Sequence, residues 1–320
     1  RSVVKLRVVF DASAPTLNGS LNDHLMSGPK LQSDLRLILH NFRTHPIVFV
    51  ADVIKMYRQI LIDPQDRSYQ HIVWRFQPSH ALSKFELNTI TYGTKPAPYL
   101  ALRVIQQLIK DEGGQFPLAA ESLARDMYVD DLATGASTVS AALTLQAEII
   151  QLLSKGGFAL SKWASNAPEL LSAVSNTSME PVSLESSEDP SIKILGLQWD
   201  PRMDSFSYKL QLPEIHFTKR SILSTIAKIF DPLGFLSPVI LNAKSLIQEL
   251  WKQELAWDQE IPATLKEFWN EIFTDLSSLS QLKIPRFVLD VKDVQYQLVG
   301  FCDASTKGMC CVFYLRVIGR

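Results

Sequence analysis

The sequence predicts a chain that mixes β-strands with amphipathic α-helices, and three observations support this prediction. Residues 47–51 form a continuous apolar run that ends in Asp52, which is typical of a strand buried on both faces. Residues 128–131 read Tyr-Val-Asp-Asp within a short apolar frame, which favours a tight hairpin turn. Apolar residues also recur at helical spacing within residues 100–109 and 137–155.

The adjacent acids Asp130 and Asp131 are the most informative feature of the chain. A strand would send their side chains to opposite faces, whereas a tight turn lets both carboxylates crowd one point. Two such carboxylates repel each other unless a divalent cation neutralises them, and Mg²⁺ held in this way also binds nucleotide phosphates. Asp52 lies 78 residues before Asp130, which is enough for a strand–helix–strand excursion that returns it beside the hairpin.

A glycine turn precedes the helix predicted after residue 98. Residues 91–98 read Thr-Tyr-Gly-Thr-Lys-Pro-Ala-Pro. The glycine permits a close backbone approach, and a helix that starts with proline offers free N–H donors for phosphate or base edges. An ordinary helix start is the alternative interpretation of this segment.

The chain resembles the palm of a reverse transcriptase in the order of three motifs. The first is a strand-ending acid with Tyr57 five residues later, the second is a Gly-x-x-x-x-Pro helix start, and the third is Tyr-x-Asp-Asp. Flanking motifs make essentially all 320 residues similar to the polyprotein of BEL/Pao-type LTR retrotransposons. These motifs lie at residues 7–13, 21–25, 28–29, 39–43, 55–57, 157–166, 195–200 and 230–234.

The resemblance implies an α+β fold of the right-hand polymerase type, with fingers, palm and thumb and an antiparallel palm sheet. The implied domains are the fingers and palm, truncated at the N-terminus (1–174), a linker (175–191), a primer-grip-like hairpin (192–217), a helical thumb or connection region (218–295) and the incomplete start of an RNase H-like domain (296–320).

Local patterns add further expected elements. The segment rich in Ser, Glu and Pro at residues 175–191 indicates a flexible connector. The other expected elements are a strand over 3–10, a helix face between residues 31 and 42, a β-rich run over 69–76, a loop at 113–117, a largely helical stretch over 218–282 with a break at 230–234, and two strands at 297–301 and 310–314.

The resemblance implies RNA-directed DNA polymerase activity. The 3′-hydroxyl of a primer would attack the α-phosphate of a deoxynucleoside triphosphate, and pyrophosphate would leave. Two Mg²⁺ ions, or Mn²⁺ in their place, would bridge the attacking and leaving oxygens. Asp52 and Asp130 would ligate these ions together with the carbonyl oxygen of Val53, and Asp131 would complete the catalytic acids.

The same resemblance assigns residues to the nucleotide. Arg7 would pair with the triphosphate, because a planar guanidinium suits phosphate. Tyr57 would stack under the sugar and reject a 2′-hydroxyl by shape, while Tyr92 and Gly93 would line the template–nucleotide pocket. Lys162 would assist the leaving pyrophosphate, with an ordinary surface lysine as the alternative interpretation.

Two further assignments concern the C-terminal half. Asp303 resembles the first metal carboxylate of a ribonuclease H, but the other acids of such a site are absent before Arg320, so RNase H activity is not expected in this fragment. Both ends resemble cuts through a longer polyprotein. The primer grip would comprise Leu195, Gly196, Leu197, Gln198 and Trp199, although a plain core strand pair explains the same residues.

Charge is distributed unevenly along a chain whose net charge is −1. Residues 1–110 carry 14 Lys or Arg and 7 Asp or Glu, whereas residues 111–200 carry 4 and 13. The basic part would hold template and triphosphate. The expected partners are an RNA and DNA template–primer, deoxynucleoside triphosphates and other parts of the same polyprotein, in a cytoplasmic retrotransposon particle or in the nucleus.

Several function classes are disfavoured. No apolar stretch approaches the length of a membrane span, so no membrane partner is expected. The three cysteines, Cys302, Cys310 and Cys311, lack both a disulfide framework and zinc spacing. The region after the connector is sometimes described as a peptidase in Pao-type elements, but no Asp-Thr/Ser-Gly occurs, so protease activity is not expected.

Two alternatives to a reverse transcriptase remain. One is a non-catalytic nucleic-acid-binding remnant of an inactive or repurposed element. Ala97-Pro98 stands where relatives usually carry Ser-Pro, although the three acids are intact. The other is a viral RNA-dependent RNA polymerase. Such polymerases usually carry Gly-Asp-Asp in place of Tyr-x-Asp-Asp, and their sugar sensor is usually an acid, whereas this chain has Tyr57.

Overall fold

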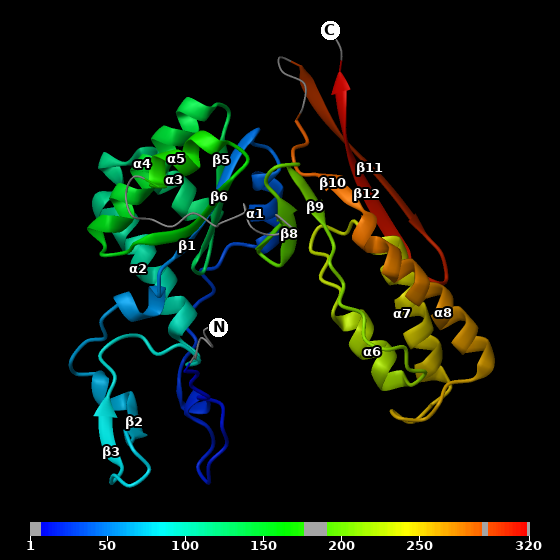
Figure 1. Ribbon diagram of the computed structural model, residues 1–320, viewed down its shortest axis with the longest axis horizontal. Helices are drawn as coiled ribbons and strands as arrows, with labels where there is room; N and C mark the ends of the chain where they lie inside the picture. Colours follow the sequence, from blue (N-terminus) through cyan, green and yellow to red (C-terminus); the bar gives the residue numbers. More distant parts are fainter. Residues whose placement is uncertain (1–7, 176–190, 290–293, 319–320) are drawn as a thin grey trace. The chain divides into compact units, whose positions relative to one another are not determined.

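The computed structural model of the protein describes residues 8–175, 191–289 and 294–318. The chain forms two compact units (Figure 1). Unit 1 comprises Arg1–Asp34 and Ile47–Val182, and unit 2 comprises Leu35–Pro46 and Ser183–Arg320. The chain therefore enters unit 2 for a short segment before it returns to unit 1. Within the described ranges, no helix has both the length and the apolarity needed to cross a membrane.

Unit 1 is built on a four-stranded antiparallel sheet with the strand order β4-β5-β1-β6. Residues 48–51 of the inner strand β1 are all buried, as the continuous apolar run predicts. The predicted buried strand and the antiparallel sheet are confirmed. The strands are β1 (Ile47–Val53), β4 (Met127–Tyr128), β5 (Asp131–Ala136) and β6 (Leu160–Ser165).

Among the described residues of unit 1 there are four α-helices, and α3, α4 and α5 pack on the sheet (Figure 1). The predicted helix over 137–155 is confirmed: the hydroxyl of Thr138 caps it by accepting from the N–H of Ala141 (3.2 Å), and it ends at Gly156. The helices are α2 (Ala97–Glu112), α3 (Pro117–Asp126), α4 (Val139–Lys155) and α5 (Pro168–Ser175).

Two local predictions need correction. The strand expected over 3–10 is wrong for residues 8–10, which are not strand, and its earlier residues lie outside the described ranges. The loop expected at 113–117 is a 3₁₀ turn whose end leads directly into α3 at Pro117. Proline suits this first helical position because its missing N–H would be unpaired there in any case.

The described part of unit 1 also contains a hairpin and short 3₁₀ turns. The predicted β-rich run over 69–76 contains β2 (His71–Trp74), which pairs with β3 (Ser83–Glu86). The side chains of this hairpin are largely exposed. The 3₁₀ turns of unit 1 are η1 (Leu21–His24), η2 (Met56–Gln59), η3 (Arg67–Tyr69) and η4 (Gly113–Gln115).

Unit 2 combines helices with a second antiparallel sheet in the order β10-β9-β8-β7. The largely helical stretch and the two late strands are confirmed, and the strands are longer than predicted. The elements are α1 (Leu35–Phe42), β7 (Ile192–Ile194), β8 (Leu197–Asp200), β9 (Ser205–Ser207), α6 (Lys219–Ala227), α7 (Ser237–Lys252), α8 (Ala263–Ser278), η5 (Leu279–Gln281), β10 (Lys283–Pro285), β11 (Gln295–Ala304) and β12 (Met309–Ile318).

The predicted break at 230–234 is organised by one carboxylate. Asp231 accepts the hydroxyl hydrogen of Tyr208 (2.8 Å) and the backbone N–H groups of Phe235 (3.0 Å) and Leu236 (2.7 Å). Burial and the neighbouring Asp231 raise the pKa of Tyr208, so that its hydroxyl remains a donor. Asp231 therefore fixes the chain as it enters α7.

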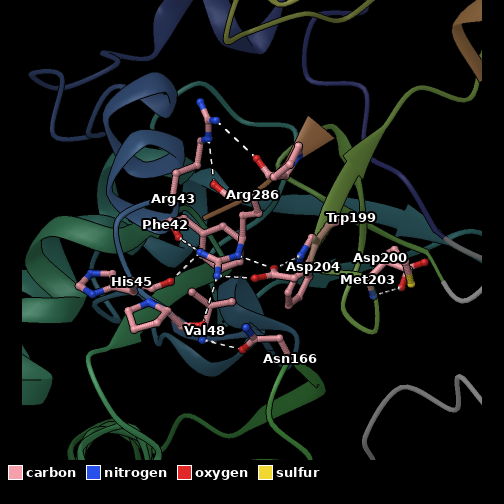
Figure 2. A network of polar contacts seen from close by, with 12 residues as sticks. Phe42, Arg43, His45, Val48, Asn166, Trp199, Asp200, Met203, Asp204 and Arg286 are labelled. Atoms are coloured by element: carbon pink, nitrogen blue, oxygen red, sulfur yellow. Dashed lines mark hydrogen bonds and ion pairs between the residues drawn. The ribbon is translucent and has the colours of Figure 1, made fainter. Parts of the chain in front are cut away.

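Arg286 is the polar centre of unit 2 (Figure 2). Its side chain has no exposed surface, and it forms a two-pronged ion pair with Asp204, with N–O distances of 2.6 and 2.7 Å. The same guanidinium donates to the carbonyl oxygens of Phe42, His45 (2.7 Å) and Pro46 (3.3 Å). A buried guanidinium is tolerated only when its donors are satisfied, and these partners supply that condition.

Aromatic packing surrounds this ion pair. The indole N–H of Trp199 donates to Asp204 (3.0 Å), and the ring of Trp199 meets that of Phe42 edge-on, with centroids 5.3 Å apart. The guanidinium of Arg43 lies 4.9 Å from the ring centre of Phe235, and its Nε donates to the carbonyl oxygen of Arg286 (3.0 Å). The α1 segment is therefore an integral part of unit 2.

Replacing Arg286 with methionine should lower the free energy of unfolding by about 3–5 kcal/mol, because it removes the charge that neutralises the carboxylate of Asp204 and the guanidinium bonds to three carbonyl oxygens. The measurement is urea denaturation followed by tryptophan fluorescence. Arg220→Met is the matched control, since its ion pair with Asp258 is largely exposed and should matter little. Equal effects of the two changes would contradict the central role of Arg286.

Candidate active site

The register of β1 brings the predicted acids together. Asp52 is directly opposite Asp131 on β5 in the antiparallel pairing. Opposed residues of an antiparallel pair have their Cα atoms about 4.5–5.5 Å apart, so the two carboxylates leave neighbouring backbone positions. On its other edge β1 pairs with β6, and an irregularity in this pairing falls between Val50 and Asp52.

A two-residue turn places Asp130 beside this pair. Tyr128 on β4 pairs with Asp131 on β5, so Val129 and Asp130 form the tip of the predicted hairpin. Val129 has a φ of 53°, in the left-handed region that β-branched residues rarely adopt. The N–H of Val53 donates to the carbonyl oxygen of Asp130 (2.8 Å), which fastens the tip to the end of β1.

Burial and neighbouring charge raise the pKa of two of the acids, Asp130 and Asp131. Burial, followed by the charges of Asp130 and Asp52, raises the pKa of Asp131 to about 6. Burial and the charge of Asp52 also raise the pKa of Asp130. The protein thus concentrates negative charge that it only partly neutralises, as expected where a cation is to be bound.

Lys162 supplies the positive charge at this point. Its ammonium group forms an ion pair with the carboxylate of Asp52. Lys162 has a φ of 56° and lies on β6, the strand that pairs with β1. Its side chain is two-thirds exposed, so the ion pair is accessible to solvent and to ligands.

Tyr57 belongs to the same cluster. It lies in η2, packs against the core of unit 1, and has its pKa raised by burial and by the charge of Asp130. The structure therefore brings together Asp52, Val53, Tyr57, Asp130, Asp131 and Lys162, which sequence reasoning assigned to metal and nucleotide binding.

Sequence reasoning missed the buried acid at the base of the hairpin. Asp126 has no exposed surface and accepts the hydroxyl hydrogen of Thr134 on β5 (2.7 Å). It also pairs with Arg125 (2.9 Å), and Ser122 on α3 donates to Thr134 (2.9 Å). These bonds join α3 to β5. A charged residue just before an apolar strand was the available signal.

The glycine turn before α2 has its own set of contacts, apart from the cluster of acids. Gly93 has a φ of 88°, and a Cβ there would lie 2.2 Å from the carbonyl oxygen of Phe10. Tyr92 donates to the carbonyl oxygen of Val8 (2.5 Å). Asn22, also missed, donates to the carbonyl oxygen of Gly93 (3.2 Å) and accepts from the N–H of Lys95 (2.7 Å).

The remaining predicted site residues are not part of this cluster as described. Arg7 lies outside the described residues. In unit 2, Leu195 and Gly196 form the β7–β8 turn, and Gln198 is half-buried. Leu195, Leu197 and Trp199 are buried, which favours the core strand pair as the role of their side chains. Asp303 is exposed near the end of β11 and accepts from the N–H of Ala304 (2.8 Å).

The donor set of the cluster suits a hard divalent cation. Mg²⁺ and Mn²⁺ prefer carboxylate, carbonyl and water oxygens, and the mutual repulsion of Asp52, Asp130 and Asp131 is what a cation would relieve. Across residues 8–175, 191–289 and 294–318, no three His, Cys, Asp or Glu side chains are arranged as a ready-made metal site. Lys162 holds Asp52 in this arrangement.

Comparison with known proteins relates the chain to retroelement polyproteins. Residues 218–320 match the family model of the Pao retrotransposon-like RNaseH-like domain. The fold is similar to the foamy viral protease-reverse transcriptase dRH in complex with ds DNA, with a TM-score of 0.64 and 16% identity. The match covers 98% of this chain and 48% of that one, so this chain spans about half its length. No curated protein matches.

Asp131 should make the stability of the metal-free protein depend on pH. Because its pKa is raised to about 6 from 3.8, the folded state binds this proton more tightly than the unfolded state between these values. The free energy of unfolding should therefore fall as pH rises from about 4 to 6. Asp131→Asn should remove the contribution of Asp131 to this fall, so the free energy of unfolding of the variant should rise relative to that of the wild type between pH 4 and pH 7. Urea denaturation in the presence of a chelator measures the effect, and parallel pH profiles would contradict it.

Proposed function

We propose that this chain is the RNA-directed DNA polymerase part of a retroelement polyprotein. The observation that carries the proposal is the arrangement of its acids: Asp52 and Asp131 stand in register on adjacent strands, and Asp130 lies at the hairpin tip beside them. The similarity of fold to a viral protease-reverse transcriptase and the Pao-type match in unit 2 support it. The proposed reaction joins a deoxynucleotide to a primer 3′-hydroxyl and releases pyrophosphate.

The three acids would act as a cation-binding cluster. Asp52 and Asp130 would hold Mg²⁺, or Mn²⁺ in its place, with the carbonyl oxygen of Val53, while Asp131 adds negative charge beside them. Two bound ions supply charge stabilisation for the attacking and leaving oxygens. The chain's own contribution is to hold the carboxylates together despite their repulsion, through the β1–β5 ladder and the bond from Val53 to Asp130.

Lys162 and Tyr57 would act on the nucleotide. The ammonium of Lys162 forms an ion pair with Asp52 at an exposed position, from which it could turn to a phosphate oxygen once another cation neutralises that carboxylate. Tyr57 lies close enough to Asp130 for that charge to add to burial in raising its pKa, so its ring is near enough to the acids to pack under an incoming sugar.

A non-catalytic nucleic-acid-binding protein is the second candidate. The ion pair between Lys162 and Asp52 favours it, because a carboxylate already neutralised by lysine need not recruit a metal ion. This alternative keeps template–primer binding but removes nucleotide transfer, so the two activities have to be measured side by side.

Asp130→Asn should abolish primer extension on an RNA template, with a loss of about a hundredfold or more, because it removes a charge that the transfer step requires. Binding of the same RNA–DNA duplex, measured by filter retention, should be unchanged. Asp275→Asn on α8 is the matched control, since this carboxylate lies on the exposed face of a helix in unit 2. A wild-type protein that binds the duplex but never extends the primer would favour the non-catalytic alternative.

Tyr57→Ala should reduce the preference for deoxy- over ribonucleotides by about tenfold or more, because rejection by shape depends on the ring. Tyr57→Phe keeps the ring and should keep the preference. Steady-state incorporation of dNTP and rNTP on one template gives both ratios. An unchanged ratio in Tyr57→Ala would remove the sugar-sensing role while leaving the polymerase assignment intact.

A further inference from the structure

The edge strand that precedes the acidic turn is paired by a side chain. β4 contains only two residues and lies at the edge of the sheet, with β5 as its neighbour on the inner side. The side-chain amide of Gln32 bonds to the backbone on either side of Tyr128. Its Nε2 donates to the carbonyl oxygen of Met127 (3.1 Å), and its Oε1 accepts the N–H of Val129 (2.9 Å).

This pair of bonds imitates one rung of a β-ladder. A primary amide offers a donor and an acceptor side by side, which is what a neighbouring strand would present to the edge of β4. Without such a partner, the carbonyl of the buried Met127 would have to find another donor. Gln32 therefore takes the place of a further strand.

The bond between Gln32 and Val129 matters because Val129 has an unfavourable backbone conformation. A β-branched residue at a φ of 53° is unfavourable, and such a conformation persists only where surrounding contacts impose it. The bond from Val129 to Gln32 is one such contact, and the bond from Val53 to the carbonyl oxygen of Asp130 is another. The tip is thus held from two sides.

Gln32 is itself held in place. Its amide nitrogen also lies 3.3 Å from the carbonyl oxygen of Ser33. A small pocket adjoins it, and its apolar walls include Leu102 and Ile109 of α2 and Leu123 of α3. The apolar side chains of this wall pack beside the amide, whose bonds run to the hairpin.

We propose that Gln32 is a positioning residue for the acidic hairpin: it holds Val129 in its left-handed conformation and thereby sets the place of Asp130. Its catalytic consequence rests on the proposed polymerase function. If the amide is lost, the peptide before Asp130 is free to rotate, and the carboxylate leaves the position beside Asp52. A misplacement of about 1 Å in an active site can lower turnover by about a hundredfold.

The test compares Gln32→Met with Gln106→Met. Methionine preserves length but removes both hydrogen bonds, and Gln106 borders the same pocket from an exposed position on α2 without a bond to the hairpin. Gln32→Met should lower kcat for primer extension by about ten- to a hundredfold, with little change in KM for dNTP or in duplex affinity. Gln106→Met should match the wild type.

Amide hydrogen exchange gives a readout that does not depend on polymerase activity. In the metal-free protein, the Val129 amide should exchange at least about tenfold faster in Gln32→Met than in the wild type, because its acceptor is gone. Gln32→Glu retains an acceptor for Val129 and loses the donor to Met127, so exchange at Val129 should stay slow in that variant. Gln32→Ala, which also loses both bonds, takes the place of Gln32→Met if that variant does not fold.

The outcomes separate this proposal from the assignment of function. Equal exchange at Val129 in the wild type and in Gln32→Met would overturn the proposal, as would a kcat loss no larger than that of Gln106→Met. Exchange that quickens in Gln32→Met while the wild type extends no primer would support the positioning role and reject the polymerase. If Gln32→Met does not fold, the same comparison is made with Gln32→Ala: exchange at Val129 as slow as in the wild type would overturn the proposal, and exchange at least about tenfold faster would support it.

Discussion

The hydrogen-bonded pairing of β1 along both of its edges is the constraint on which the proposed active site depends. A strand whose inner residues are all buried cannot slip by one position without turning its apolar side chains to the wrong face. The register with β5 therefore fixes Asp52 opposite Asp131, and the pairing with β6 brings Lys162 to the same end of the strand. The carboxylates repel one another, and the packing and hydrogen bonds of the buried sheet offset this repulsion.

Local patterns predicted the parts of this arrangement that depend on neighbours in sequence. The apolar run before Asp52, the turn at Asp130 and the capped helix after Thr138 follow from short-range rules. Contacts between segments distant in sequence could not be predicted in this way. Gln32 bonds to Val129 across 97 residues, and the sequence around Gln32 contains no pattern that indicates this bond. The sequence did not predict α3, because the glycines at 113–114 and Pro117 are as typical of a continuing loop as of a helix start.

Backbone strain gathers around the acids. Six non-glycine residues in the described ranges have positive φ, and three of them, Lys55, Val129 and Lys162, flank or belong to the cluster. Each lies within three residues of an acid or pairs with one. Unfavourable conformations persist where packing and hydrogen bonds impose them, and they are found preferentially at functional sites. The protein thus adopts unfavourable backbone conformations where it positions charged side chains.

Arg286 has a consequence for how segments of such polyproteins can be exchanged. It lies inside the residues that match the Pao-type domain, whereas Asp204 and the carbonyl oxygens of Phe42 and Pro46 lie before that match begins. The limit of sequence similarity is therefore not a limit of structural independence. A recombination event that transfers only residues 218–320 would separate a buried cation from its acceptors, so functional chimeras have to co-inherit the short α1 segment and the β8–β9 turn.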